Sequence, residues 1–413
     1  METPSLEREH PGPTAPADAA RRMEKPDLRA YPLPRLAGLL ERLGEPPYRA
    51  RQVFRWLHQR GAADFEAMSD LPKALRLLLA DRFRLATLAV ADERRSRDGT
   101  LKWKWRTSDG HFVESVYMPQ QAGAAEGLAD DEDDEPAPPR GRVRRTLCVS
   151  SQVGCAIGCT FCLTGTMGLA RHLSAGEMVD QVHRANERLL ALGEGPPPRP
   201  LTNLVFMGMG EPLHNYANLK LALEILLSED GPHFSHRHVT VSTSGLAPQM
   251  RRLGEETRVK LALSLNATTD AQRDLLMPVN RRYPLAALLD ACRAFPARQG
   301  RRITFEYVLL AGVNDGDEDA LRLADLVRGI PSKVNLIPYN ENPGLGYRAP
   351  SAERVAAFQE RLVARRVTAV VRRDRGRDIA AACGQLAVEG GPGDPRRRKP
   401  GSEGRAPGGG EAR

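Results

Sequence analysis

The sequence predicts an α/β protein built around a mainly parallel β-sheet. From Thr146 onward, short apolar runs of strand length alternate with helical patterns, giving about six strand–helix units. Repeated units of this kind place successive strands parallel, with right-handed crossovers through the helices. One helix opens with a capping box, Ser174-x-x-Glu177. The strand-like runs are residues 146–152, 203–208, 238–244, 259–267, 303–310, 333–339 and 368–373.

Length and composition limit the class of protein. A chain of 413 residues has room for one large domain with accessory segments. No uninterrupted apolar run approaches the ~20 residues of a membrane-spanning helix, and the opening METPSLEREHPGP lacks an apolar signal region. We therefore expect a cytoplasmic protein without membrane association. Six cysteines, three of them in one short motif, fit a reducing compartment better than a disulfide framework.

The formal net charge of +8 is unevenly distributed. Residues 126–135 contain seven acidic and no basic side chains, so the remainder of the chain carries +15. A basic surplus favours a polyanionic partner, because contacts with phosphates supply much of the affinity for nucleic acids. An arginine-rich surface that is only solvated would carry the same charge, so charge alone does not decide between the two.

The N-terminal part predicts a disordered arm followed by three short helices. Residues 1–28 are rich in Pro, Ala and charge without periodicity, which is typical of disorder. Residues 29–84 carry three apolar stripes of helical spacing, and we expect Asp70 to cap the third helix. The stripes are Leu36, Leu39, Leu40 and Leu43; Ala50, Val53, Phe54 and Leu57; and Leu71, Ala74, Leu75 and Leu78. The second helix also places four arginines off its stripe: Arg49, Arg51, Arg55 and Arg60.

Residues 85–119 predict a short antiparallel β element. Asp98-Gly99 and Asp109-Gly110 are strong hairpin-turn signals. Between them apolar and basic residues alternate, so one face should pack and the other should meet solvent or phosphate. Glu114 lies in the next run, and a strand carboxylate beside a basic strand usually forms a cross-strand ion pair. The alternating residues are Leu101, Trp103 and Trp105 with Lys102, Lys104 and Arg106.

Two segments have low complexity. Residues 120–143 are acidic and rich in Pro and Ala, a composition that cannot bury a core, so we expect a disordered insert. Residues 389–413 contain a basic cluster at 396–399 and predict a disordered tail with nonspecific affinity for nucleic acid.

A cysteine motif lies in the first strand–helix unit. Cys155, Cys159 and Cys162 form C-x3-C-x2-C, on a loop in which Gly154 and Gly158 supply conformational freedom. A structural zinc ion is bound by four protein ligands, usually from paired C-x2-C knuckles, which are absent here. Three thiolates instead leave one corner of an iron–sulfur cube open to a substrate or cofactor. The alternative is a chance cluster or a partial zinc site.

This motif, with the aromatic Phe161 before its last cysteine, is similar to the signature of radical S-adenosylmethionine (SAM) enzymes. The longer string TLCVSSQVGC, residues 146–155, resembles the RlmN group of RNA adenine methyltransferases. The resemblance covers about residues 30–119 and 144–388. It implies that residues 144–388 form a partial (β/α)6 radical SAM barrel with a C-terminal methyl-carrier segment. It also implies that residues 29–84 form an RNA-binding accessory domain.

The same resemblance implies one 4Fe–4S cluster held by Cys155, Cys159 and Cys162, and two SAM molecules per turnover. Candidate SAM contacts lie at the ends of successive strands, where barrel enzymes carry their chemistry. Glu211, after the run 203–208, matches the acid that holds the SAM amino group. Ser and Asn at such positions more often form turns. The other matches are Gly210, Ser242, Ser264, Leu265, Asn266 (His in several relatives) and Asn340.

Two further cysteines resemble the catalytic pair of the family. Cys383, in AACGQ, matches the methyl carrier and Cys148 matches its disulfide partner, whereas Cys292 falls in a helical stripe and should be a core residue. Glu114 matches a proton acceptor. By resemblance, one SAM methylates Cys383, and a second gives a radical that activates this methyl group for addition to adenine carbon 2. A base then removes the carbon-2 proton, and Cys148 releases the product by forming a disulfide with Cys383.

Three other functions stay open at this point. One is a methyltransferase acting at carbon 8 of the same adenine, which shares the five functional cysteines; GMGEPL and YRARQVF lean toward carbon 2. A glycyl-radical activase would need neither Cys383 nor a basic helical module, and a plain RNA-binding protein would need no cluster. The resemblance implies 23S rRNA as substrate, with transfer RNA as a second one left open. It further implies a flavodoxin-like electron donor and a monomer.

Overall fold

A computed structural model of the chain describes residues 25–85, 88–120, 143–296, 301–342, 344–372 and 375–387. The predicted arm, insert and tail lie outside these ranges, except at their borders. There the structure differs from the prediction: Leu28 is completely buried, and Gln120 is the last residue of a strand. In the described ranges no helix combines the length and the apolar character that crossing a membrane requires.

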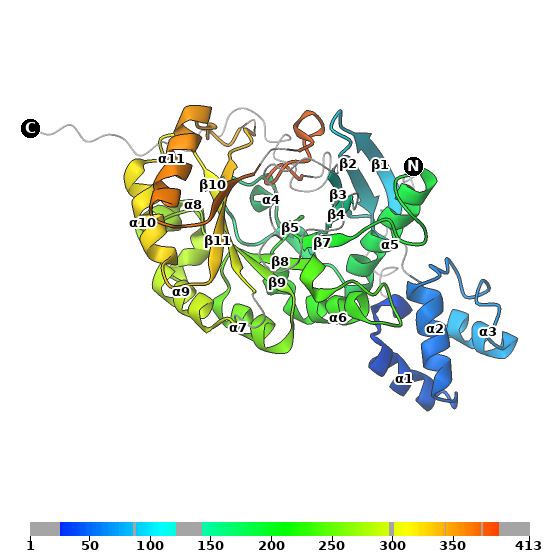
Figure 1. Cartoon of the computed structure of the whole chain (residues 1–413). Helices are drawn as coiled ribbons and strands as arrows, with labels where there is room; N and C mark the ends of the chain where they lie inside the picture. The colour runs from blue at the N-terminus through cyan, green and yellow to red at the C-terminus, as the bar shows by residue number, and fades with distance from the viewer. Residues whose placement is uncertain are drawn as a thin grey trace, which may run out of the picture.

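One large sheet runs through the molecule (Figure 1). Its strands are β1 (Ala89–Arg95), β2 (Leu101–Arg106), β3 (Phe112–Gln120), β4 (Arg144–Cys148), β7 (Asn203–Phe206), β8 (Val239–Thr243), β9 (Lys260–Ser264), β10 (Ile303–Leu309), β11 (Ser332–Pro338) and β12 (Ala369–Val371). They are ordered as they occur in the chain, antiparallel from β1 to β4 and parallel from β4 to β12. The predicted α/β class and its seven strand-like runs are confirmed. The antiparallel element is an edge of this same sheet.

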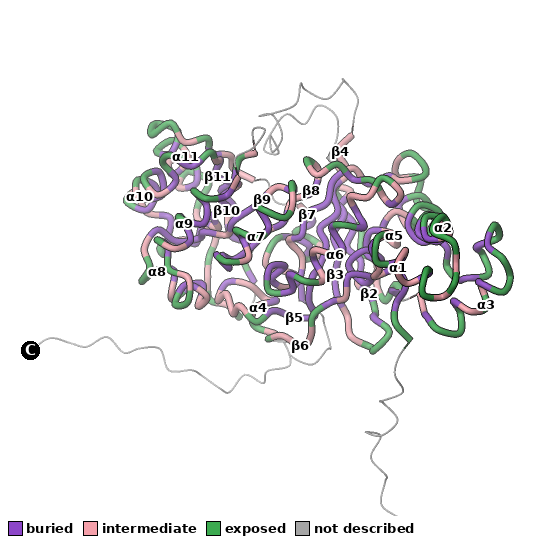
Figure 2. The backbone as a smooth tube through the Cα atoms, turned by 90° about the horizontal axis from the view of Figure 1, so that it is seen from below, coloured by how far each residue is buried: buried purple, intermediate pink, exposed green. Residues whose placement is uncertain are grey.

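Each parallel crossover contains helix, as repeated strand–helix units require. The helices are α5 (Ala175–Ala191), α6 (Tyr216–Leu227), α7 (Ala247–Glu256), α8 (Asp270–Leu276), α9 (Leu285–Ala294), α10 (Asp317–Val327) and α11 (Ala352–Ala364). They lie along the outer side of the curved sheet, with exposed outer faces and buried strands behind them (Figure 2). The result is an open barrel whose strand ends converge on one mouth.

Local sequence explains how these elements form. All four residues of β7, NLVF, are buried, as expected for a parallel strand covered on both faces. The capping box of α5 is present, because Glu177 N donates to Ser174 Oγ and Ser174 N donates to Glu177 Oε2. Cys292 is buried in α9, which confirms it as a core residue.

The N-terminal module contains a short 3-10 turn, η2 (Leu28–Ala30), and helices α1 (Leu33–Arg42), α2 (Tyr48–His58) and α3 (Lys73–Arg82). The prediction that Asp70 caps the third helix was wrong, because α3 begins after Pro72 and has no side-chain cap. Asp70 instead accepts a hydrogen bond from the indole of Trp56. The buried residues along this segment are Leu71, Leu75 and Leu79.

The module is joined to the barrel by buried polar contacts. Arg29 forms an ion pair with Asp180 of α5, and both side chains are almost fully buried. Removing one partner of such a pair strands a buried charge and typically costs about 3–5 kcal/mol. Beside them, His58 Nδ1 lies 3.3 Å from His183 Nε2. This junction fixes the module on α5.

The four arginines that lie off the apolar stripe of this segment meet acidic partners. Arg51 and Arg55 both pair with Asp230, which follows α6, so they belong to the junction with the barrel. Arg49 lies near Glu45, and Arg60 pairs with Asp70. Local spacing could place these side chains off the apolar stripe, but it could not show that acidic partners meet them there.

Candidate active site

The cysteine motif is held on a loop between two short antiparallel strands, β5 (Gln152–Cys155) and β6 (Gly168–His172). Cys155 ends β5, and Cys159 and Cys162 follow in the loop before the short helix α4 (Leu163–Thr166). Gly154 has φ 75°, and a Cβ atom there would lie 1.9 Å from the carbonyl oxygen of Gly168. Only glycine allows the strands to approach so closely at this bend.

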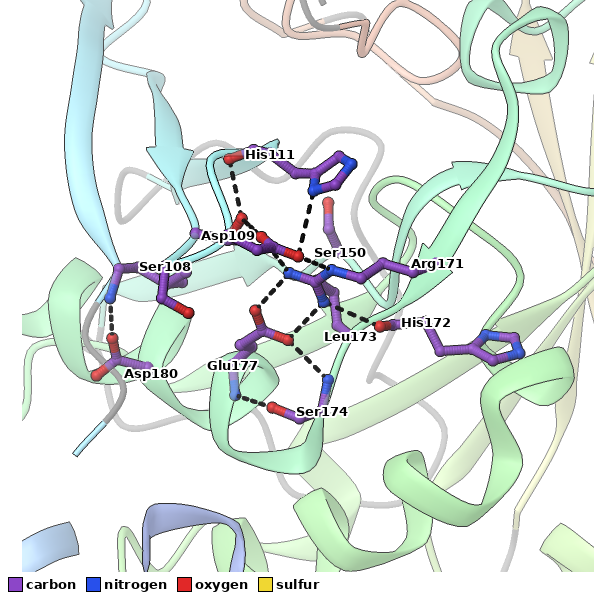
Figure 3. A network of polar contacts seen from close by, with 12 residues as sticks. Ser108, Asp109, His111, Ser150, Arg171, His172, Leu173, Ser174, Glu177 and Asp180 are labelled. Atoms are coloured by element: carbon purple, nitrogen blue, oxygen red, sulfur yellow. Dashed lines mark hydrogen bonds and ion pairs between the residues drawn. The ribbon is translucent and has the colours of Figure 1, made fainter. Parts of the chain in front are cut away.

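An ion-pair network anchors this loop to the rest of the barrel (Figure 3). Arg171 of β6 donates to both carboxylate oxygens of Asp109, in the β2–β3 turn, at 2.6 and 2.9 Å. It also donates to both oxygens of Glu177 at 2.8 and 2.9 Å. Bidentate pairs of this kind fix orientation as well as adding stability. They hold β6, and with it the end of the cysteine loop, against α5.

The three motif cysteines line one cavity at the mouth of the barrel. Burial raises the pKa of all three bare thiols, that of Cys155 to about 12. Among the described residues, no three His, Cys, Asp or Glu side chains converge where a single metal ion would fit. The thiolate ligands of a cubane bind different iron atoms, so they need not converge as the ligands of one ion do. The donor set therefore fits a cluster.

The predicted strand-end residues gather around the same cavity. Gly210 has φ 97°, and a Cβ atom there would lie 2.4 Å from the Cβ of Gln152, so glycine is required. Asn340 is buried, and within the described structure its Oδ1 has no hydrogen-bond partner. A buried acceptor facing a cavity fits a polar ligand. The predicted residues that line the cavity are Cys155, Cys159, Cys162, Gly210, Glu211, Ser242, Ser264, Asn266, Asn340 and Cys383.

Glu211 and Asn266 are held firmly in place. Glu211 Oε1 accepts from Leu213 N at 3.0 Å, and Oε2 accepts from Ser244 N at 2.7 Å. Burial raises the pKa of this carboxyl group, and the backbone amides oppose that shift. Asn266 Oδ1 accepts from Val308 N at 2.8 Å. Leu265 belongs to the hydrophobic core and does not line the cavity, so its cofactor role stays a prediction.

Cys383 comes to the cavity from the end of the described chain. It follows the 3-10 turn η7 (Arg377–Ile379), and its side chain is exposed. The segment 376–387, which we call the carrier segment, docks on the cysteine loop: Thr164 Oγ1 donates to Leu386 O at 2.6 Å. The other end of the carrier segment docks on the β1–β2 turn, where Asp98 Oδ2 accepts from Gly376 N at 3.0 Å.

Cys148 is close enough to Cys383 to interact with it electrostatically. It ends β4 opposite Val116 of β3, is buried and does not line the cavity. Burial first, and then the neighbouring Cys383, raises the pKa of the Cys148 thiol to about 12. Since β3 and β4 pair from Val116–Cys148 to Gln120–Arg144, the acidic insert joins the far ends of a hairpin. The insert therefore does not change the distance between Glu114 and Cys148.

Glu114 is buried in β3, outside the cavity lining. Its Oε1 lies 3.4 Å from the ammonium of Lys102, so the predicted cross-strand ion pair is present. Lys102 itself is buried, which corrects the expectation that the basic face of β2 meets solvent. The role of Glu114 as proton acceptor stays a prediction.

Sequence reasoning missed several cavity residues. Arg372 directly follows β12, and attention to the end of the last strand would have found it. Glu306 lies in the middle of β10. A carboxylate inside the apolar run 303–310 is itself unusual, but a search limited to the ends of strands does not find it. Thr164 and Tyr339 carry no distinctive pattern.

Comparisons with known proteins agree with this geometry. The Radical SAM superfamily profile matches residues 149–324, and the profile of the ribosomal RNA large subunit methyltransferase N-terminal domain matches residues 27–85. A dual-specificity RNA methyltransferase RlmN from Anaeromyxobacter sp. (strain Fw109-5) is 67% identical over 387 residues, covering 94% of this chain and 97% of the relative. The dual-specificity RNA methyltransferase RlmN 2 of Myxococcus xanthus (strain DK1622) is 58% identical over 350 residues, covering 85% and 87%.

A solved structure is also similar. The crystal structure of a radical SAM methyltransferase from Sphaerobacter thermophilus matches with a TM-score of 0.77 and 46% identity. The match covers 87% of this chain and 99% of that protein.

Proposed function

The chain belongs to the RlmN family of dual-specificity RNA methyltransferases in the radical SAM superfamily, and we propose that it methylates carbon 2 of adenosine in 23S rRNA and in transfer RNA. One observation carries the proposal for the chain's own residues. Cys383 lines the same cavity as Cys155, Cys159 and Cys162, although it comes from the opposite end of the barrel sequence. A carrier cysteine has to lie beside a SAM site, and the shared cavity supports that role for Cys383.

Two cofactors fit the cavity by the chemistry of its walls. Cys155, Cys159 and Cys162 would hold a 4Fe–4S cluster, because three soft donors leave one iron open. Glu211 and Asn340 supply buried acceptors for the polar groups of SAM. When bound, the cluster supplies the single electron that cleaves SAM.

Burial separates the roles of Cys148 and Cys383. Cys383 is exposed at the cavity, so its sulfur can take the methyl group from a first SAM by displacement, with S-adenosylhomocysteine as the leaving molecule. Cys148 is buried and does not line the cavity, and burial raises the pKa of its thiol, so its sulfur is shielded from the first SAM. Cys148 thus escapes methylation and remains available to form the disulfide with Cys383 that releases the product.

Adenine carbon 2 is not nucleophilic, so ordinary displacement from SAM cannot methylate it and a carrier is needed. We assign Glu114 as the acceptor of the carbon-2 proton. The adenine must leave its stack to reach the cavity, as bases do when enzymes act on them. We further propose a flavodoxin-like electron donor, a monomer and a cytoplasmic location, where thiols stay reduced.

Mass spectrometry of digested substrate RNA tests this function. After reaction with SAM and a reductant, we expect 2-methyladenosine from the native enzyme and none from the Cys383→Ala variant. 8-Methyladenosine would show instead the sister activity at carbon 8, which shares the same cysteines. An enzyme with a full cluster that leaves adenosine unmethylated would contradict the proposal altogether.

A further inference from the structure

A single buried ammonium joins Glu114 to the carrier segment. Lys102 Nζ lies 3.4 Å from Glu114 Oε1 and donates a hydrogen bond to the carbonyl of Ala380 at 3.0 Å. Ala380 lies three residues before Cys383 in the carrier segment. Lys102 is 6% exposed and Glu114 is 4% exposed, so water does not screen the pair.

A cross-strand pair that only stabilised the sheet would not need the second contact of Lys102, with Ala380. The carrier segment is already fastened at the β1–β2 turn, where Ser96 Oγ donates to Asp378 Oδ1 at 2.6 Å and Asp98 accepts from Gly376. The contact with Ala380 lies farther along the carrier segment. Lys102 and Glu114 lie on the same face of the sheet, because Lys104, two residues after Lys102, is the register partner of Glu114. The contact with Ala380 therefore sets how the carrier segment lies over this carboxylate.

We propose that Lys102 is a positioning residue, which holds the carrier segment against Glu114 and keeps the Glu114 carboxylate ionised to receive the proton from adenine carbon 2. This inference rests on the proposed function. In that step the carbon–hydrogen bond breaks, the proton passes to a Glu114 oxygen, and the electron pair stays on the purine ring. A neutral carboxylic acid could not accept the proton.

The charges around Glu114 support this role. Burial raises the pKa of Glu114, and Lys102 is the largest opposing influence, followed by the backbone amide of Ala387 and then Lys104. On the other side, Cys148 at the end of strand β4 lies opposite Val116, and Ser150, which follows β4, donates its hydroxyl to the Glu114 carbonyl. Without the Lys102 charge the opposing influence is weaker, so the pKa must rise and the ionised fraction at neutral pH must fall.

The test follows the covalent RNA–protein adduct in a single-turnover reaction quenched onto a denaturing gel. Lys102→Gln keeps a donor for Ala380 O but lacks the charge, so it should fold and take up the methyl group. We expect its adduct to persist markedly longer at pH 7 than in the native enzyme, because a smaller fraction of the Glu114 carboxyl group is ionised without the Lys102 charge. Raising the pH to 9 should restore fast release. Lys102→Arg should behave like the native enzyme.

Two controls separate charge from fold. Arg106→Met removes a positive charge from the exposed end of the same strand and should leave adduct release unchanged. Lys102→Gln combined with Glu114→Gln should hold the adduct at every pH, since no carboxylate is left to ionise. Iron content and SAM cleavage should match the native enzyme in all of these variants.

Release from Lys102→Gln at the native rate, or slow release that does not respond to pH, would overturn the role of Lys102. Failure of the proposed function itself looks different. In that case no adduct forms in any variant, including Cys148→Ala, which keeps Lys102 and Glu114 intact.

Discussion

Leu163 donates its backbone N–H to the carbonyl of Gly384 at 2.9 Å. Leu163 directly follows Cys162, and Gly384 directly follows Cys383. One backbone hydrogen bond therefore holds Cys383 beside the cysteine loop. Because both groups belong to the main chain, substituting either cysteine leaves this contact in place. The cysteines can therefore be changed one at a time while the carrier segment stays docked.

The cluster ligands give the first prediction. Changing Cys155, Cys159 or Cys162 to Ala should abolish iron binding and reductive cleavage of SAM, because a cubane with two protein thiolates is poorly held. Iron analysis and the iron–sulfur absorbance band after anaerobic purification measure this. Cys292→Ala is the matched control, since it also removes a buried thiol but lies in α9, and it should keep full iron. Full iron in the triple variant would refute the assignment.

The acidic insert gives the second. Replacing residues 121–143 by Asn-Gly should leave methylation and the melting temperature nearly unchanged, because Gln120 and Arg144 already face each other and can be closed by a two-residue turn. Thermal melting and the methylation assay read out the two effects. Loss of the fold would show that the insert carries structure. A folded but inactive enzyme would assign the insert a role in admitting RNA.

The histidine pair at the module junction gives the third. Burial first, and then the charges of Arg29 and Arg184, lowers the pKa of His183 to about 3; burial also lowers the pKa of His58. Below pH 6.5 both imidazoles become protonated in the unfolded chain but stay neutral in the folded junction. The contribution of the two histidines to the free energy of unfolding is therefore fully present above about pH 6.5. It is lost as the pH falls toward 3, by up to about 1.4 kcal/mol per pH unit for each histidine.

Urea unfolding between pH 5 and pH 8 measures this slope. His58→Gln with His183→Gln should flatten it, whereas His233→Asn, at an exposed histidine with positive φ that Asn tolerates, should not. An unchanged slope in the double variant would mean that other groups govern the pH dependence.

Much of the fold could be predicted because it rests on local pattern. Short apolar runs such as 203–206 and 260–264 form buried strands, as their pattern predicts. Small polar residues at strand ends, such as Ser242, line one cavity because parallel strands share a direction. Gly154 and Gly158 have the positive φ that their place in the motif predicts.

The rest depends on contacts between distant segments. Lys102 alternates with tryptophans like any surface residue, and it is buried only because the carrier segment, far along the chain, covers it. Arg55 looks free on its helix until Asp230 meets it. Local spacing shows which way a side chain points from its own element, but it carries no record of what approaches from elsewhere.

The central claim is that Cys383 carries the methyl group and Cys148 resolves the adduct. A denaturing gel of each alanine variant, after reaction with substrate RNA, SAM and a reductant, tests it most directly. Cys148→Ala should accept the methyl group and add to the RNA but fail to release it, leaving an RNase-sensitive shifted band. Cys383→Ala should show no such band, because nothing covalent can form. Identical behaviour of the two variants, both active or both without a band, would contradict the assigned roles.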